Sequence, residues 1–238
     1  KINEEKSQSL IASNESIIFD AGQAFVAKFF DNLLIKFAKF QTENFISKIF
    51  TKNNTKEIKG LYLYGGVGRG KSMMMDLFFH QVQIKEKRRL QFHDFMKEVH
   101  QRILEKRKIE KNKDTVLLVG QDLAKNAKLL CFDEMEVKDI ADAMILSRLF
   151  EVMFAQGTIL VTTSNQPPDG LYKDGLHRDR ILPFIENLKL KTDIVKIPEG
   201  EDWRKRSLSG QKYWLSPVNK TNKEKINEIF KTLSLIHI

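Results

Sequence analysis

The sequence predicts an α/β fold in which a five-stranded, mostly parallel sheet carries helices on both faces. Two observations lead to this prediction. Short apolar runs alternate with longer segments of helical apolar spacing, and a glycine-rich turn directly follows the first run. Such alternation is typical of parallel sheets, because a crossover between parallel strands usually contains a helix. The runs that indicate strands are 60–64, 90–93, 129–133, 158–164 and 193–197.

Apolar residues at helical spacing indicate helices in the stretches between these strands. The expected helices after the first strand are 72–83, 95–106, 115–126, 139–154 and 179–189. Ahead of the first strand, one helical segment covers 25–37 and a second lies near 45–50. Asp20 is placed as the N-cap of the first segment, with Gln23 three residues on to bond back.

The pattern divides the chain into three parts. Residues 1–52 are expected to form an N-terminal helical segment that packs on the core, 53–217 the α/β core with all five strands, and 218–238 a C-terminal tail. The tail ends in an apolar stretch that is open to interpretation as truncated or foreign sequence, and no helical lid domain is evident. With 42% hydrophobic residues, the chain can build an ordinary core.

Cysteine content and hydropathy set expectations about the compartment. Cys131 is the one cysteine and lies inside an apolar run, which excludes a disulfide framework and favours a reducing compartment. No stretch approaches the ~20 apolar residues that cross a bilayer, and nothing at the start resembles a signal peptide. We therefore expect a cytoplasmic protein.

The net charge of +9 raises the question of an anionic partner such as nucleic acid. Most of the excess lies in two runs, 85–89 and 106–113, which flank predicted elements and are interrupted by acidic or amide residues. Solvated loop surface is the favoured interpretation of both runs, and an anionic partner is the alternative.

A phosphate-binding pattern follows the first strand. The eight residues fit G-x-x-x-x-G-K-[ST], and they are Gly65, Gly66, Val67, Gly68, Arg69, Gly70, Lys71 and Ser72. Glycines let backbone N–H groups face phosphate oxygens, and the next helix directs its positive end to the same anion. Lys71 is expected to contact the β- and γ-phosphates, and the Ser72 hydroxyl to ligate Mg²⁺. The sequence therefore predicts a nucleoside triphosphate binder.

Two acids end the strand at 129–133. A buried strand delivers Asp133 to the Mg²⁺ shell, and Glu134 is placed to orient and deprotonate an attacking water. Taken without other motifs, two adjacent acids more commonly form a turn that caps the next helix. Together with the upstream glycine loop, the pair favours catalysis.

Asn165 follows the strand at 158–164. In P-loop ATPases with an additional strand, this strand lies between the other two, so a polar residue at its tip faces the γ-phosphate and the water. Asn165 is thus a candidate sensor. An asparagine chosen for the turn before Pro167 explains it equally well.

Arg178 and Arg180 precede the last predicted helix. Arginines at a helix start oppose the local dipole, so they are poorly explained as caps. One interpretation is an arginine finger that reaches a neighbouring subunit's γ-phosphate, which requires an oligomer. The other interpretation is a pair of arginines that are simply exposed to solvent.

These motifs together resemble the AFG/ZapE family of AAA+ ATPases. The resemblance is carried by 60–72, 92–100, 131–144, 163–168 and 171–183, and it extends over most of the chain. It implies Walker A at 65–72, Walker B at Asp133 and Glu134, sensor 1 at Asn165, and a finger region at Arg178 and Arg180. A D-x-x-Q stretch matches at 20–23, where contacts to the nucleotide base could lie.

The chain departs from the family pattern at Ser72, where Thr is usual, and at Trp203, where Tyr is common. The first swap keeps the hydroxyl.

The resemblance also implies an activity. Members couple hydrolysis of ATP, with Mg²⁺, at subunit boundaries to remodelling of a protein partner in cell division or membrane-protein quality control. It implies a homo-oligomer that is cytoplasmic, with peripheral association at the inner membrane or a mitochondrial matrix location left open. A nucleic-acid-associated P-loop ATPase such as a helicase loader is the alternative, motivated by the basic runs.

Overall fold

A computed structural model describes residues 21–47 and 58–199. These residues form a five-stranded sheet with the strand order β2-β3-β4-β1-β5, and every strand pair is parallel. The strands are β1 (Gly60–Tyr64), β2 (Lys87–Gln91), β3 (Leu129–Asp133), β4 (Ile159–Ser164) and β5 (Thr192–Lys196). The predicted α/β sheet is therefore confirmed, and the strand expected between the glycine-loop strand and the acidic strand is there.

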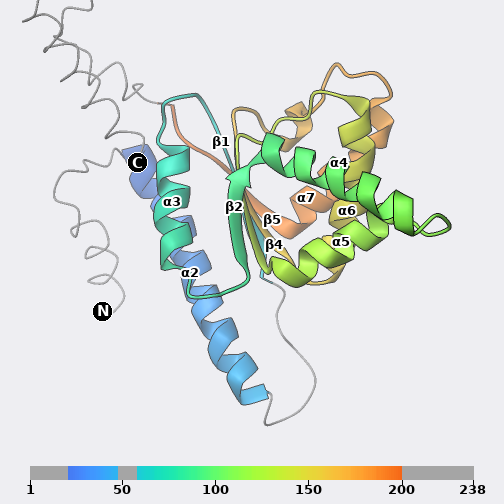
Figure 1. Cartoon of the computed structure of the whole chain (residues 1–238). Helices are drawn as coiled ribbons and strands as arrows, with labels where there is room; N and C mark the ends of the chain where they lie inside the picture. Colours follow the sequence, from blue (N-terminus) through green and yellow to red (C-terminus); the bar gives the residue numbers. More distant parts are fainter. Residues whose placement is uncertain (1–20, 48–57, 200–238) are drawn as a thin grey trace, which may run out of the picture.

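Helices cover both faces of this sheet (Figure 1). One face carries α2 (Ala21–Ser47) and α3 (Lys71–Gln81). The other carries α4 (Phe92–Ile109), α5 (Thr115–Asn126), α6 (Ile140–Ala155) and α7 (Leu182–Lys191). Two short 3₁₀ turns, η1 (Pro168–Gly170) and η2 (Arg178–Arg180), lie between β4 and α7. None of the helices in the two described stretches has both the length and the apolar composition that a membrane crossing needs.

The second strand lies three residues earlier at its start than predicted. The sequence indicated 90–93, whereas β2 covers Lys87–Gln91 and Phe92 already begins α4. Phe92 is the first of five buried residues at helical spacing, so the helix takes it. An edge strand has only one neighbour and accepts charged side chains, which is why basic residues can form β2.

The N-terminal prediction of two helices is wrong within the described residues. A single helix, α2, runs through 37–45 without interruption, because neither Gly nor Pro stands there to break it. Its buried side chains fall at helical spacing and are Val26, Phe30, Leu33 and Phe37. The ring of Phe30 lies 5.2 Å from that of Phe78 on α3, measured between centroids. The residues at 48–50, and Asp20, lie outside the described part.

The last predicted helix begins later than expected. Residues 178–180 form the turn η2, and α7 starts at Leu182. Pro183 stands in the first turn of α7, where its missing N–H is not needed. The helix therefore begins one residue before Pro183 rather than at Asp179.

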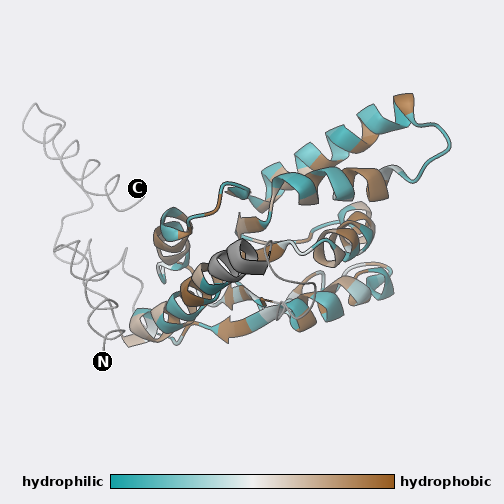
Figure 2. Cartoon of the chain, turned by 90° about the horizontal axis from the view of Figure 1, so that it is seen from below, coloured by the Kyte–Doolittle hydropathy of each residue, from teal (hydrophilic) through white to brown (hydrophobic). Residues whose placement is uncertain are grey.

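Alternate residues of each strand face opposite layers. Leu61 and Leu63 of β1 pack with α2 and α3, whereas Tyr62 between them belongs to the larger cluster under α4 to α7. Teal and brown alternate along the covering helices in Figure 2, as expected for helices that turn one apolar side to the sheet. Cys131 is buried on the α3 side, and burial raises the pKa of its thiol. It is a core residue, as its apolar surroundings in the sequence indicated.

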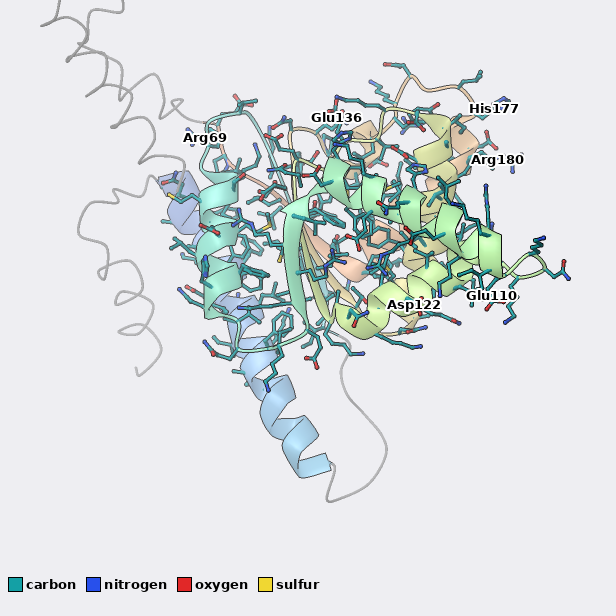
Figure 3. All side chains as sticks on the ribbon, viewed as in Figure 1. Arg69, Glu110, Asp122, Glu136, His177 and Arg180 are labelled. Carbon is teal, nitrogen blue, oxygen red and sulfur yellow. The ribbon has the colours of Figure 1, made fainter. Side chains whose placement is uncertain are left out.

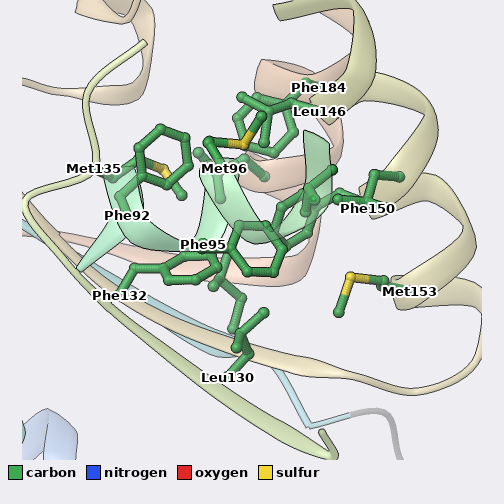
Figure 4. Packing of buried hydrophobic residues seen from close by; sticks show 14 of the residues in the cluster. Phe92, Phe95, Met96, Leu130, Phe132, Met135, Leu146, Phe150, Met153 and Phe184 are labelled. Carbon is green, nitrogen blue, oxygen red and sulfur yellow. The ribbon is translucent and has the colours of Figure 1, made fainter. Parts of the chain in front are cut away.

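Aromatic rings hold the larger cluster together (Figure 4). Phe150 of α6 lies 6.1 Å from both Phe95 and Phe132, 5.3 Å from Phe154 and 5.4 Å from Phe184, between ring centroids. It thus connects β3 with three of the helices on that face.

Replacing Phe150 by alanine is expected to lower the free energy of unfolding by about 3–5 kcal/mol, because a buried ring is lost and a cavity remains. Ile109→Ala is the control, since Ile109 is 79% exposed and its truncation should change stability by no more than about 0.5 kcal/mol. Urea unfolding of both variants measures the difference. Equal midpoints would contradict the central role of this ring.

Candidate functional site

The glycine loop joins β1 to α3, as the motif required. Lys71 is the first residue of α3, and Gly70 before it has φ 74°, in the left-handed region. A Cβ added to Gly70 would lie 2.7 Å from the Gln23 side-chain nitrogen. Only glycine meets both conditions without strain. The loop therefore brings its backbone close to its neighbours at the N-terminus of a helix, where anions bind favourably.

Gln23 of α2 supports this loop. Its side chain is buried, with 3% exposed, and its Nε2 donates to the backbone oxygen of Arg69 at 3.4 Å. The sequence left a helix cap and a base contact open for Gln23, and a contact to the loop itself was not foreseen. The long separation in sequence, 46 residues, hides such a contact from pattern reasoning.

Lys71 links the loop to the tip of β4. Lys71 is 8% exposed, and its ammonium donates to the carbonyl oxygens of Gly65 at 2.8 Å and Gly66 at 2.7 Å. It also donates to Oδ1 of Asn165 at 3.1 Å. Because β4 lies beside β1, the predicted phosphate lysine and the predicted sensor meet, 94 residues apart in sequence.

The two acids lie at the end of β3, one strand further on. Asp133 is buried with 5% exposed, and Glu134 is exposed with φ 55°. The turn they form is fastened to β4, since the Glu134 N–H donates to Oγ1 of Thr163 at 3.1 Å. The Met135 N–H donates to the Thr163 carbonyl at 2.8 Å, and the Ser164 hydroxyl donates to the Met135 carbonyl at 2.9 Å. Three hydrogen bonds thus hold a non-glycine residue in a conformation that costs about 1 kcal/mol or more.

Arg89 of β2 is a site residue that the sequence analysis missed. Its Nε and Nη2 donate to Oδ2 of Asp133 at 3.1 and 2.9 Å, and Nη2 also donates to the Ser72 carbonyl at 3.2 Å. Its Nη1 forms an ion pair with Asp76 of α3. The guanidinium therefore joins both predicted Mg²⁺ residues.

The interpretation of the first basic run as solvated loop is wrong for its second half. Lys87, Arg88 and Arg89 form β2, and Arg88 pairs with Glu98 of α4 through bonds of 3.2 and 2.6 Å. These bonds lower the pKa of the Glu98 carboxyl. Strand alternation could have found this arrangement, because it sends neighbouring arginines to opposite faces.

The donors at this edge suit Mg²⁺. Asp133 and Ser72 offer a carboxylate and a hydroxyl, which are the hard oxygen ligands the ion prefers. Among residues 21–47 and 58–199, no group of three or more His, Cys, Asp or Glu side chains could hold a metal ion. Mg²⁺ at phosphate sites is commonly bound by one or two protein groups together with the phosphates, so the residues present fit it.

Arg178 and Arg180 lie away from the glycine loop of their own chain. In Figure 3, Arg180 projects on the far side of the molecule from Arg69 of the loop. Nη2 of Arg178 donates to the Asp169 carbonyl at 2.6 Å, which ties η2 to η1. The Arg180 side chain is 62% exposed, with Nε 3.5 Å from Oδ2 of the adjacent Asp179.

These features define a class of protein. A strand, a glycine loop and a helix lie beside a polar-tipped strand, and an acid-tipped strand follows, which is the arrangement of P-loop nucleotide-binding folds with an additional central strand. Solved structures agree on the fold alone. A DNA replication initiation factor has a TM-score of 0.53 at 15% identity, covering 94% of this chain and 63% of that one. Domain III of the Thermotoga maritima replication initiation protein DnaA has a TM-score of 0.52 at 14% identity, covering 82% and 72%.

The chain belongs to the AFG1-like ATPase family, whose pattern matches residues 9–237. It is 40% identical over 177 residues to the cell division protein ZapE of Escherichia coli K12, covering 74% of this chain and 46% of ZapE. It is 42% identical over 186 residues to lactation elevated protein 1 homolog B of Danio rerio, covering 74% of this chain and 37% of that protein. The chain thus spans less than half the length of these relatives. The family resemblance predicted from the motifs is confirmed.

Thr163→Val tests how the acidic turn is held. The substitution keeps the shape but leaves the Glu134 N–H without its acceptor and removes the 3.5 Å hydrogen bond from the Thr163 hydroxyl to Oδ1 of Asp133, so stability should fall by about 1–3 kcal/mol. Thr162→Val is the matched control, because Thr162 is equally buried and its hydroxyl makes only a 3.4 Å contact to a neighbouring carbonyl. Chemical denaturation compares the two, and equal losses would rule out a special role for the Thr163 hydroxyl.

Proposed function

We propose that this chain binds Mg-ATP at the loop 65–72 and hydrolyses it. The observation that carries the proposal is the position of the Lys71 ammonium between the loop carbonyls and Asn165. It lies at the edge of the sheet where β3 ends with Asp133. A positive charge, a helix N-terminus and a buried acid for a divalent cation are the parts that phosphoryl transfer from ATP uses. Membership in a family of ATPases supports the same conclusion.

Each residue then has a role that follows from its chemistry. Lys71 supplies a point charge to the β- and γ-phosphates, and loop N–H groups from 65–72 bind phosphate oxygens. Ser72 and Asp133 would hold Mg²⁺, which when bound offsets negative charge on the phosphates. Glu134 is exposed at a fixed turn, where its carboxylate can orient a water and take its proton. Asn165 is the proposed sensor of the γ-phosphate.

Hydrolysis at a boundary between subunits is the second part of the proposal. Arg180 points into solvent away from the loop of its own chain, so it can reach a phosphate only in another copy. Arg178 is bound to the η1 backbone and is better placed to hold η2 in position. We therefore assign Arg180 as the finger and Arg178 as its support, in a homo-oligomer.

The energy of hydrolysis is proposed to move a bound protein partner. The similarity to a cell division protein supports a partner of division or quality-control machinery. Within this proposal, 53–217 is the ATPase core, 1–52 a segment docked on it, and 218–238 a tail. A cytoplasmic location, with peripheral contact to the inner membrane or a place in the mitochondrial matrix, belongs to the same proposal.

A nucleic-acid-associated ATPase such as a helicase loader is the competing function. The observation in its favour is the second basic run, whose residues 107–109 end α4 on the surface and lead into the exposed loop 111–114 (Figure 2). DNA or RNA should then raise ATP turnover in a salt-sensitive manner. Stimulation by a protein partner instead would favour remodelling.

Lys71→Ala and Glu134→Gln separate binding from hydrolysis. Lys71→Ala should weaken ATP affinity by about tenfold or more, because it removes the charge on the phosphates. Glu134→Gln should keep the affinity and lower turnover by about 10²-fold or more, because the amide is not a base. Calorimetry and phosphate release measure the two effects. Wild-type affinity in the first variant, or wild-type turnover in the second, would remove the residue from its role.

A mixing experiment tests the finger. Arg180→Ala subunits lack the proposed finger and Lys71→Ala subunits lack the loop charge, so neither alone should turn over ATP. Mixed together, they form some boundaries with an intact loop and an intact finger, and part of the activity should return. Absence of any rescue in a mixed oligomer verified by co-purification would refute action between subunits.

A further inference from the structure

Asp133 already has a cationic partner inside the chain. It is buried, yet its Oδ2 accepts two hydrogen bonds from Arg89, at 3.1 and 2.9 Å. A carboxylate oxygen offers about two lone pairs, so these bonds occupy the atom. Removing one partner of such a pair leaves an uncompensated buried charge, which is strongly unfavourable.

Arg89 also has a second anion within reach. Its Nη1 pairs with Asp76, which lies on α3 one helical turn after Ser72. The Asp76 side chain is 32% exposed, whereas that of Asp133 is 7% exposed. The guanidinium thus bridges an inner and an outer carboxylate, and it can give up the inner one without losing all of its charge pairing.

A divalent cation and Arg89 make competing demands on Asp133. Arg89 binds Oδ2, and Oδ1 accepts a 3.5 Å hydrogen bond from the Thr163 hydroxyl. A divalent cation on either oxygen would lie within a few ångströms of the guanidinium, and two positive centres this close repel each other. Mg²⁺ also accepts only short, well-placed oxygen ligands. A guanidinium bound to Oδ2 therefore opposes the ion.

We propose that Arg89 is a movable counter-ion for Asp133: it holds this carboxylate until Mg-ATP binds, and then releases it while it keeps its ion pair with Asp76. The proposal rests on the proposed function of the site and adds two positioning residues, Arg89 and Asp76. It implies that Arg89 sets the Mg²⁺ concentration at which nucleotide binding is strengthened, and that Asp76 determines how readily Arg89 yields.

The test measures the affinity for a non-hydrolysable ATP analogue by calorimetry as Mg²⁺ is varied. Arg89→Gln removes the guanidinium that competes with Mg²⁺ for Asp133. The Mg²⁺ concentration that gives half of the gain in analogue affinity should therefore fall by about tenfold. Asp76→Asn removes the outer partner, so that concentration should rise. In the double variant, Asp76→Asn should have no further effect if it acts through Arg89. A merely structural role of Arg89 would shift affinity with and without Mg²⁺ alike.

Arg88→Gln is the matched control. It makes the same change of charge on the same strand, but its side chain pairs with Glu98 on the opposite face of the sheet. Its Mg²⁺ dependence should stay within about twofold of wild type. Arg89→Gln behaving like Arg88→Gln, or needing more Mg²⁺ than wild type, overturns the proposal. Should Arg89→Gln not fold, Arg89→Lys keeps the charge without the fork and should give a smaller shift of the same sign.

A second measurement separates this inference from the function of the site. In nucleotide-free protein, Asp133→Asn should lower the melting temperature in the wild-type background and raise it, or leave it unchanged, in the Arg89→Gln background. This coupling needs no nucleotide. If the coupling is observed but the protein binds no ATP, the Arg89–Asp133 pair is supported and the Mg-ATP function is refuted. If the effects of the two substitutions on the melting temperature are additive, the pair itself is refuted.

Discussion

The site depends on the placement of β4 between β1 and β3. Parallel strands end at the same edge of a sheet, so this order brings three segments that are distant in sequence to one place. Lys71 reaches Asn165 at the end of β4, and the turn after Asp133 is fastened to Thr163 of the same strand. The central strand is thus a shared support for the loop and for the acids. A slip in its register would separate all three.

Much of this arrangement could be read from the sequence. The glycine loop has a spacing that few other structures need, and the strands of a parallel sheet are apolar enough to stand out. The position of β4 between β1 and β3 followed from the class of fold. Boundaries were less certain where two principles compete, as at Phe92, which suits a strand by residue type and a helix by the spacing of its successors. In the structure Phe92 begins α4, where it is buried together with the apolar residues that follow it at helical spacing.

What the sequence could not supply were contacts between side chains on different elements. Arg89 lies in a basic run that resembles solvated surface, and only the pairing of β2 with β3 turns it toward Asp133. Gln23 was foreseen as important for a different reason, and its bond to the Arg69 carbonyl depends on how α2 packs against α3. Contacts of this kind require the register and the packing, which no local pattern contains.

Cys131 is the one cysteine of the sequence and is buried, which has a practical consequence for spectroscopy. The sequence contains no other thiol, and this one is fully enclosed in the sheet, where desolvation disfavours the reactive thiolate. A cysteine introduced at an exposed position such as Ile109 would therefore be the preferred target of a fluorescent or spin label without removal of the native residue. Distances between labels on neighbouring copies could then report on assembly in otherwise unaltered protein.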